Sequence, residues 1–240
     1  MDLLVTGIKE IDDRIFGGFP RSQYVLVFGD VGVGKGILCR QILYNALIRG
    51  EYGIYFTLRN SPGDVRSKMG YFGWDTTKFE EEGSFIIVDG YSGLIGREEI
   101  QKSDAEYVID DPTNLIRVSK VMDEVLDRVK GHHFLVLVDD LTTLLYYVET
   151  KELLRHIMKF KAKLKRLNGI NFYILHEKAL DPQTVAQIES IMDSLVEVRY
   201  VEKERLERQL RIKSMIGKKP LTYWFLFEIT DYGIEISRLI

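Results

Sequence analysis

The sequence predicts an α/β fold in which a mostly parallel, twisted sheet is flanked by helices and carries antiparallel strands at its C-terminal edge. Short apolar runs alternate with amphipathic stretches through the first 180 residues, which is typical of layered α/β proteins. A glycine-rich loop joins the first of these runs to a helical stretch. After Pro182 the pattern changes to short strands and turns, which favours an antiparallel edge.

Length and composition limit the architecture and the class of protein. The chain has 240 residues, of which 45% are hydrophobic and 29% are charged, enough for one large core. We expect a single domain over 1–240, made of an N-terminal segment (1–22), a nucleotide-binding core (23–180) and a C-terminal β extension (190–240). The formal net charge of −3 argues against a protein that coats nucleic acid, although it leaves a local basic patch open.

Cysteine content and hydropathy indicate the cellular setting. The single cysteine, Cys39, excludes an internal disulfide and fits a reducing cytoplasm. The opening residues are short and acidic, unlike a signal peptide, and no apolar stretch reaches the roughly 18 residues that a membrane span needs. We therefore expect a cytoplasmic protein without membrane contact. Abundant charged residues and scarce Asn, Gln and Cys favour a hot environment.

Each element of the central core follows from its own pattern. Residues 24–28 (YVLVF) form a short apolar strand that ends at Gly29. Residues 37–48 place Leu38, Ile42 and Ala46 on one face, as an amphipathic helix does. The same patterns predict strands at 53–58, 84–88, 134–138 and 170–175, and helices at 61–71, 112–130 and 151–167.

Two regions depart from this alternation. Residues 92–111 are polar and poorly patterned, so we expect them to form a mobile loop. Beyond Pro182 the sequence predicts an antiparallel extension on the edge of the sheet. Its predicted strands are 195–201, 210–216, 223–229 and 234–236, with a turn at 231–233.

The glycine-rich loop carries the clearest chemistry. Residues 29–36 (GDVGVGKG) match the phosphate-binding pattern G-x-x-x-x-G-K-[ST] except at the last position. In such loops, backbone N–H groups surround the phosphate oxygens and the lysine, here Lys35, adds positive charge. Gly36 lacks the hydroxyl that normally binds Mg²⁺. The predicted nucleotide-binding residues are Gly29, Asp30, Val31, Gly32, Val33, Gly34, Lys35, Gly36 and Ile37.

A strand-end carboxylate supports this interpretation. Asp139 follows the apolar strand 134–138, the arrangement in which a carboxylate orients the hydration shell of Mg²⁺ in phosphate-loop enzymes. Asp139 is therefore the candidate metal ligand. Strand-end Asp residues also cap helices, and a glycine-rich loop also serves as a plain strand-to-helix turn, so a structural role stays open for both features.

The opening residues 4–22 (LVTGIKEIDDRIFGGFPRS) resemble the start of KaiC-like and RadA-like ATPases of the RecA superfamily. The resemblance continues through the glycine-rich loop, YFT (55–57), LVDD (137–140) and FEITDYGIEI (227–236), and so covers nearly the whole chain. It implies a RecA-like P-loop fold with ATP or ADP as the ligand. It also implies a homo-oligomer, with a hexamer as the specific form, but it names no protein partner and does not indicate nucleic acid.

The same resemblance shows where this chain departs from an active ATPase. The family's acidic pair, which activates the attacking water, corresponds here to Arg59 and Asn60, and neither side chain is a suitable base. The family's later K-x-R segment supplies cations to the neighbouring subunit's nucleotide. Lys213 remains at that place, but Met215 stands where the arginine would be. Together with Gly36, three parts of the hydrolytic site therefore differ from the family's pattern. We expect the binding of Mg²⁺ to be weakened.

These departures predict a nucleotide-binding pseudo-ATPase with a regulatory or scaffold role. A further hypothesis is that Arg59 lies near the γ-phosphate and replaces part of the lost metal charge. The first alternative is an active ATPase of the signalling or DNA-repair type, with Asp140 or Glu177 as its acid. The second alternative is an interaction module that keeps the fold and binds no nucleotide.

Other side chains have two interpretations each. His176, at a strand end, either contacts the nucleotide or makes a local hydrogen bond. Trp74, Tyr146 and Tyr147 are large enough to stack on a base, but packing in the core is the expected role. The basic face of helix 151–167 is expected to be solvated, with binding to nucleic acid or an acidic partner as the alternative.

Overall fold

The computed structural model describes residues 2–217 and 221–239; residues 1, 218–220 and 240 of the predicted terminal segments lie outside the described part. Twelve strands are present in that part of the chain. Their bounds are β1 (Leu3–Leu4), β2 (Phe19–Pro20), β3 (Tyr24–Gly29), β4 (Tyr52–Thr57), β5 (Phe85–Asp89), β6 (Tyr107–Val108), β7 (Phe134–Asp139), β8 (Ile170–His176), β9 (Ser194–Glu202), β10 (Leu206–Met215), β11 (Leu221–Thr230) and β12 (Gly233–Leu239).

The helices connect these strands. A short 3₁₀ turn, Glu177–Ala179, follows β8. The α-helices are α1 (Lys9–Arg14), α2 (Lys35–Ile48), α3 (Pro62–Gly70), α4 (Thr77–Glu81), α5 (Tyr91–Ile95), α6 (Arg97–Lys102), α7 (Leu115–Arg128), α8 (Leu141–Leu145), α9 (Thr150–Leu167) and α10 (Pro182–Ser190). None of the helices in the described residues is both long and apolar enough to cross a membrane.

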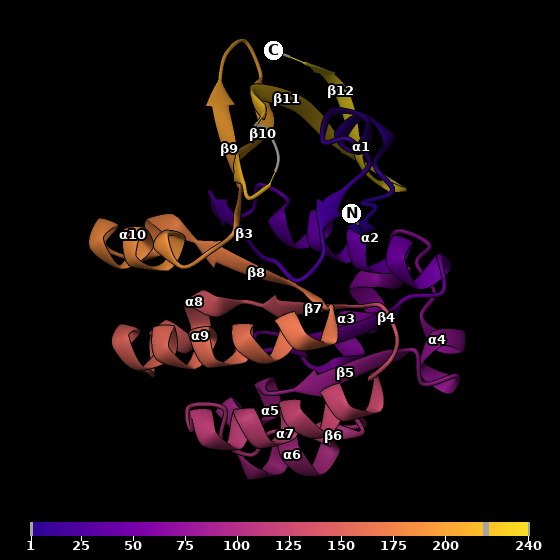
Figure 1. Cartoon of the computed structure of the whole chain (residues 1–240), viewed down its shortest axis with the longest axis vertical. Coiled ribbons are helices and arrows are strands. Elements are labelled where there is room, and N and C mark those ends of the chain that lie inside the picture. The colour runs from indigo at the N-terminus through magenta and orange to yellow at the C-terminus, as the bar shows by residue number, and fades with distance from the viewer. Residues whose placement is uncertain (1, 218–220, 240) are drawn as a thin grey trace.

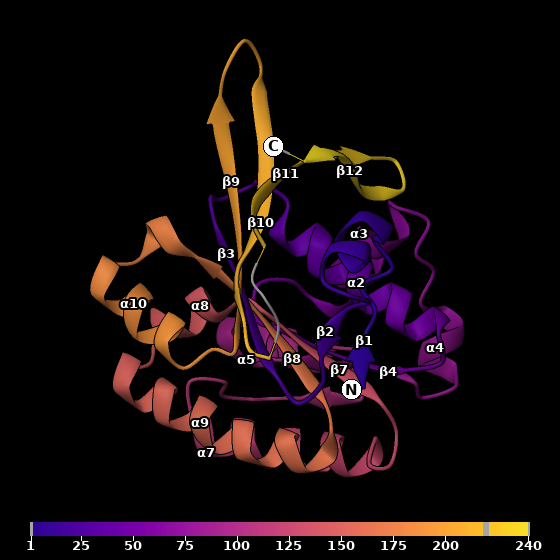
Figure 2. The ribbon, with the colours of Figure 1, turned by 45° about the horizontal axis from the view of Figure 1, so that its top comes forward.

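Ten strands form one sheet in the order β12-β11-β10-β9-β3-β8-β7-β4-β5-β6 (Figure 1). Every neighbouring pair from β9 to β6 is parallel. The pairs β9–β10, β10–β11 and β11–β12 are antiparallel. The predicted fold class is therefore confirmed, including the antiparallel C-terminal edge. Figure 2 shows β9 and β10 as a hairpin that projects beyond the rest of the sheet.

The helices bury both faces of the sheet, and two hydrophobic clusters result. Successive side chains of a strand point to opposite faces, so β3 supplies Val25 and Val27 to one cluster and Leu26 and Phe28 to the other. The first cluster packs α1, α2 and α3 against the sheet, and the second packs α7, α9 and α10 against it. The all-buried pattern of β3 and β7 follows from this double coverage.

The expectation that 92–111 forms a mobile loop is wrong. This stretch contains α5, α6 and β6, with β6 paired to β5. The buried carboxylate of Asp89 organises it, accepting hydrogen bonds from Ser92 Oγ at 2.6 Å and Ser103 Oγ at 2.5 Å. These contacts are tertiary, and the exposed helices leave little periodic apolar signal in the sequence.

Other boundaries also differ from the expectations. The predicted helix 112–130 begins later, because the side chain of Asn114 accepts hydrogen bonds from the backbone N–H groups of Ile116 and Arg117 and caps α7 there. Helix α10 was missed, although Asp181 caps it and Pro182 stands at its first turn. The short helices α1, α4 and α8 were missed as well.

The structure gives different answers for the three aromatic residues that had two interpretations, Trp74, Tyr146 and Tyr147. Trp74 is buried and stacks on Phe72, which confirms core packing. Tyr146 and Tyr147 are 64% and 63% exposed, so the expectation of core packing is wrong for them. They follow the short helix α8, whose buried side chains come before them in the chain.

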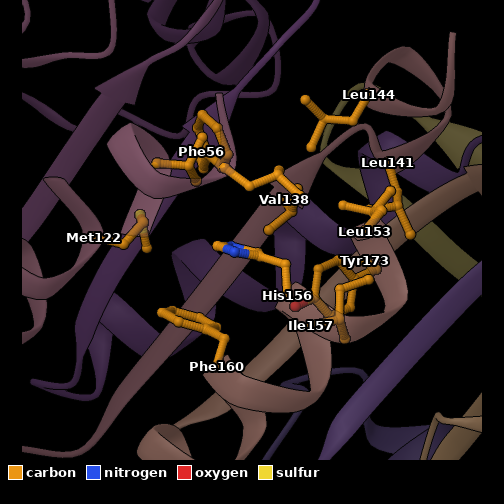
Figure 3. A pocket seen from close by; sticks show the side chains of 12 residues that line it. Phe56, Met122, Val138, Leu141, Leu144, Leu153, His156, Ile157, Phe160 and Tyr173 are labelled. Atoms are coloured by element: carbon orange, nitrogen blue, oxygen red, sulfur yellow. The ribbon is translucent and has the colours of Figure 1, made fainter. Parts of the chain in front are cut away.

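An apolar pocket lies in the core beneath α9, facing α7 and β7 (Figure 3). Its lining is hydrophobic except for His156 and Tyr173, so it does not suit a phosphate. The ring nitrogen Nδ1 of His156 lies 3.4 Å from Ser119 Oγ. Burial, together with the nearby charge of Lys159, lowers the pKa of His156 below its ordinary value of 6.5.

Protonation of His156 is expected to destabilise the fold in acid. Because its folded-state pKa is lowered, the unfolded chain binds the proton first, and the free energy of unfolding falls as the pH drops below about 6.5. We expect His156→Gln to lose this part of the pH dependence when urea unfolding is compared at about pH 7.5 and about pH 5. The exposed His132 provides the control His132→Gln, which should keep the wild-type dependence. An unchanged dependence in His156→Gln would contradict this assignment.

Candidate functional site

The glycine-rich loop lies where β3 ends and α2 begins. Its glycines Gly29, Gly32 and Gly34 have φ angles of +131°, +77° and +115°, in the region that glycine adopts at least cost. A Cβ atom on Gly29 would lie 1.8 Å from the carbonyl oxygen of Val198, so β9 passes too close for any side chain there. The backbone path of the loop therefore requires glycine.

Strand β9 also holds the loop through hydrogen bonds. The backbone N–H of Tyr200 donates to Asp30 Oδ2 at 2.8 Å, and the Tyr200 hydroxyl donates to the carbonyl of Gly32 at 2.9 Å. Lys178 forms an ion pair with Asp30. Burial opposes the charge of Asp30, but the hydrogen bonds from Lys178 and Tyr200 hold its pKa below the ordinary value. Asp30 thus supports the loop from behind.

Lys35 folds back into the loop at the start of α2. Its ammonium group donates to the carbonyl oxygens of Gly29 at 2.8 Å and Asp30 at 2.5 Å, and the residue is only 3% exposed. Burial lowers the pKa of Lys35 to about 8. An anion at this position would favour the charged form of the side chain.

A cleft of about 330 Å³ opens in front of the loop, a volume at the lower end of the range of small-molecule sites. Four cationic side chains and one carboxylate from the described residues line it, a balance that suits a polyphosphate anion. The full lining is Val31, Gly32, Gly34, Lys35, Gly36, Ile37, Arg40, Arg59, Asn60, Lys68, Asp139, Ile174 and His176.

The cleft brings together most of the predicted site residues. Gly29, Asp30 and Val33 do not line it, since Val33 is fully buried and the other two shape the loop from behind. Arg40 and Lys68 line it and were missed by the sequence reasoning. The signal for Arg40 was available, because residues four apart share one face of a helix and Gly36 lies in the first turn of α2, beside the loop.

Asp139 is bound to protein side chains. Its Oδ2 atom accepts a hydrogen bond from the Tyr55 hydroxyl at 2.5 Å and lies 3.5 Å from Nη1 of Arg40. Nη1 also lies 3.3 Å from the Tyr55 oxygen. Burial, and next the charge of Asp139, raise the pKa of Tyr55 well above its ordinary value, so Tyr55 acts as the donor.

These residues do not fit a magnesium ion bound in the usual way. Mg²⁺ needs near-octahedral oxygen coordination, yet Gly36 offers no hydroxyl and Asp139 already accepts hydrogen bonds from Tyr55 and Arg40. Within residues 2–217 and 221–239, no group of three or more His, Cys, Asp or Glu side chains is arranged to hold a metal.

Arg59, His176 and Asp140 form a second charged cluster beside the cleft. Nη1 of Arg59 lies 3.0 Å from Asp140 Oδ2 and 2.7 Å from His176 Nε2, and His176 Nε2 lies 3.3 Å from the same carboxylate oxygen. Burial opposes the charge of Asp140, but the contacts with His176, the Thr143 N–H and Arg59 hold its pKa below the ordinary value. His176 both makes a local hydrogen bond and lines the cleft.

The other residues singled out for hydrolysis do not line the cleft. Met215 is 7% exposed, packed in the hydrophobic core. Lys213 Nζ pairs with Glu189 Oε1 at 3.0 Å, on the surface near α10. Glu177 lies just after β8, and burial, followed by the charges of Glu197 and Asp30, raises its pKa.

Comparisons with known proteins bear on the family and the fold. A family model described as "ATPase: KaiC" matches residues 4–239. A "UPF0273 protein" of Aeropyrum pernix is 33% identical over 98% of this chain and 94% of its own length. A "UPF0273 protein" of Thermotoga maritima is 31% identical over 96% and 94%. The crystal structure of a KaiC-like protein from Pyrococcus horikoshii superposes with a TM-score of 0.81, covering 99% of both chains at 24% identity, which supports the same fold.

Anion binding next to Lys35 is expected to take up protons at alkaline pH. The free side chain titrates near pH 8, and a bound phosphate favours its protonated form. Titration of ATP at about pH 8.5 should therefore show a heat that depends on the ionisation enthalpy of the buffer, whereas at about pH 7 this dependence should shrink. The variant Lys35→Arg, which stays charged, should lack it. Binding heats that are the same in buffers of low and high ionisation enthalpy, at both pH values, would contradict the role of Lys35.

Proposed function

Because the chain belongs to the KaiC family of ATPases, we propose that it binds ATP or ADP and hydrolyses ATP weakly or not at all. The observation that carries the proposal is the cleft, which is lined by a phosphate loop and by four cationic side chains, one of them Lys35 of the loop itself. The loop backbone and Lys35 would hold the phosphates, with Gly29 to Ile37 as the nucleotide-binding segment. The protein acts through nucleotide occupancy, in a regulatory or scaffold role.

The absence of a suitable base in the family's usual place supports weak or absent hydrolysis. Arg59 and Asn60 stand in place of the acidic pair, and a permanently charged guanidinium cannot accept a proton. Asp140 lies close by, but Arg59 and His176 already occupy its Oδ2 atom and its pKa is lowered. A carboxylate stabilised in its charged form by such contacts is a poor proton acceptor.

One observation favours an active ATPase as the second candidate. Glu177 follows His176 at the end of β8, and its pKa is raised by burial and by the charges of Glu197 and Asp30. A raised carboxylate pKa improves a general base near neutral pH. Under this alternative, Glu177 activates the attacking water, and the function is ATP hydrolysis in signalling or DNA repair.

Assembly forms part of the same proposal. We infer a homo-oligomer, specifically a hexamer, with nucleotide between subunits. The support is the family resemblance, of which the chain keeps Lys213. The buried Met215 stands where the family's arginine would be and counts against the assembly. The single domain over 1–240 would be the repeating unit of that assembly.

Nucleotide binding predicts a stability increase that depends on Lys35. With ATP at about 100 times its Kd, the free energy of unfolding should rise by about 2.7 kcal/mol. Lys35→Ala should lose this increase because it removes the phosphate-binding charge, whereas Lys130→Ala, on an exposed residue outside the cleft, should keep it. Thermal unfolding with and without ATP measures the stability increase in the wild type and in each variant. No stabilisation of the wild-type protein by ATP would instead favour the interaction module that binds no nucleotide.

Phosphate release separates the two candidate functions. We expect the wild-type protein to release phosphate from ATP at the background rate of Lys35→Ala or only slightly above it. Steady release well above that background would contradict the pseudo-ATPase proposal. If Glu177→Gln then abolished the release while ATP still stabilised the fold, Glu177 would be the base.

The hexamer predicts a mass of about six times the 27.9 kDa of the chain. Light scattering of the purified protein, with and without ATP, measures this mass directly. A monomer under both conditions would refute the inferred assembly without affecting nucleotide binding.

A further inference from the structure

We propose that the guanidinium of Arg40 takes the place of the metal ion in this cleft, so that the protein binds a nucleotide polyphosphate without Mg²⁺. The inference rests on the proposed nucleotide binding and specifies the ionic form of the ligand. That form is the free polyphosphate anion, and its magnesium complex is disfavoured. Three features of the described residues carry the argument.

The first feature is the space beside Gly36. Gly36 and Arg40 are four residues apart on α2 and therefore share a face of the helix. A Cβ atom on Gly36 would lie 3.2 Å from Nη1 and 3.4 Å from Nη2 of Arg40, which is closer than ordinary packing. The guanidinium thus fills the space in which a metal-binding Ser or Thr side chain would begin. The lack of a side chain at Gly36 leaves room for the guanidinium of Arg40.

The second feature is the partner of Arg40. Nη1 of Arg40 and the Tyr55 hydroxyl both contact Oδ2 of Asp139, and all three residues are buried. The positive charge of Arg40 already compensates the negative charge of Asp139. A divalent cation added beside them would meet the guanidinium at close range in a buried environment, where charge repulsion is strong.

The third feature is that some N–H groups of Arg40 remain available to donate hydrogen bonds to a bound anion. Among the described residues, the hydrogen bonds of its guanidinium run through Nη1, and the buried Nε has no partner. Nη2 lies beside Gly36, and the side chain contributes to the wall of the cleft next to Lys35. A guanidinium stays charged and pairs well with phosphate oxygens, so it suits a permanent site for this anion.

Arg40 is better suited to this role than Arg59. Arg59 also lines the cleft, but its side chain is 48% exposed and binds Asp140 and His176. Arg40 is buried at the base of the phosphate loop, where a charge is less screened by solvent. The compensation for the lost metal therefore comes mainly from α2, the helix that begins within the loop.

The test compares ATP binding in EDTA and in excess Mg²⁺ by isothermal titration. We expect the wild-type protein to bind ATP at least as tightly in EDTA. Asp139→Asn should bind as tightly or more tightly in EDTA, because it frees Arg40, whereas loss of a metal-binding carboxylate would weaken binding in Mg²⁺. The double variant Arg40→Met with Asp139→Asn should bind ATP in EDTA at least about tenfold more weakly than Asp139→Asn alone, since it loses a charged hydrogen bond to phosphate.

The controls make each outcome decisive. The pair Arg21 and Glu51, 2.8 Å apart and outside the cleft, provides the matched double variant Arg21→Met with Glu51→Gln, which should bind ATP like the wild type. Circular dichroism checks that each variant is folded. A strict Mg²⁺ requirement, weaker binding in Asp139→Asn, or wild-type binding in the Arg40 double variant would each overturn this inference and leave nucleotide binding intact. No ATP binding in either buffer would overturn both.

Discussion

The close approach of β9 to the end of β3 is the constraint on which the candidate site depends. The carbonyl oxygen of Val198 lies where a side chain on Gly29 would begin, so the loop can turn into α2 only along a glycine path. The same strand binds Asp30 and Gly32 through Tyr200. Strand β9 also begins the antiparallel edge of the sheet, so the C-terminal extension is part of the support of the loop.

The C-terminal strands reinforce that support from a second direction. Phe227 and Ile229 of β11 pack against Gly34, and a Cβ atom there would lie 3.4 Å and 3.2 Å from them. Gln41 of α2 exchanges hydrogen bonds with the backbone of Ile234 in β12, at 3.1 Å and 2.7 Å. The helix that follows the loop is thereby held at the loop and about two turns later. A rigid loop of this kind holds its N–H groups ready for an anion at little entropic cost.

The charged residues in and beside the cleft are of two kinds, those paired with an opposite charge and those without such a partner. Asp139 and Asp140 are each neutralised by a protein cation, Arg40 and Arg59 respectively. Lys35 has only carbonyl oxygens as hydrogen-bond partners in the described part of the chain, and its lowered pKa shows that burial is not fully compensated. Among the described residues, Lys35 is therefore a charge without a carboxylate partner next to the loop, where a phosphate would be strongly bound.

The sequence by itself determined where most strands and the long helices fall along the chain, the position of the phosphate loop and the antiparallel edge, because periodicity and glycine spacing are local properties. It did not predict the short helices of 91–102, which depend on the buried Asp89. Gly36 showed that a hydroxyl was missing, but only the tertiary structure revealed that Arg40 and Tyr55 surround Asp139. The reason is physical: Asp139 lies 84 residues after Tyr55 and 99 after Arg40 in the chain, and no local pattern records which side chains meet across a folded sheet.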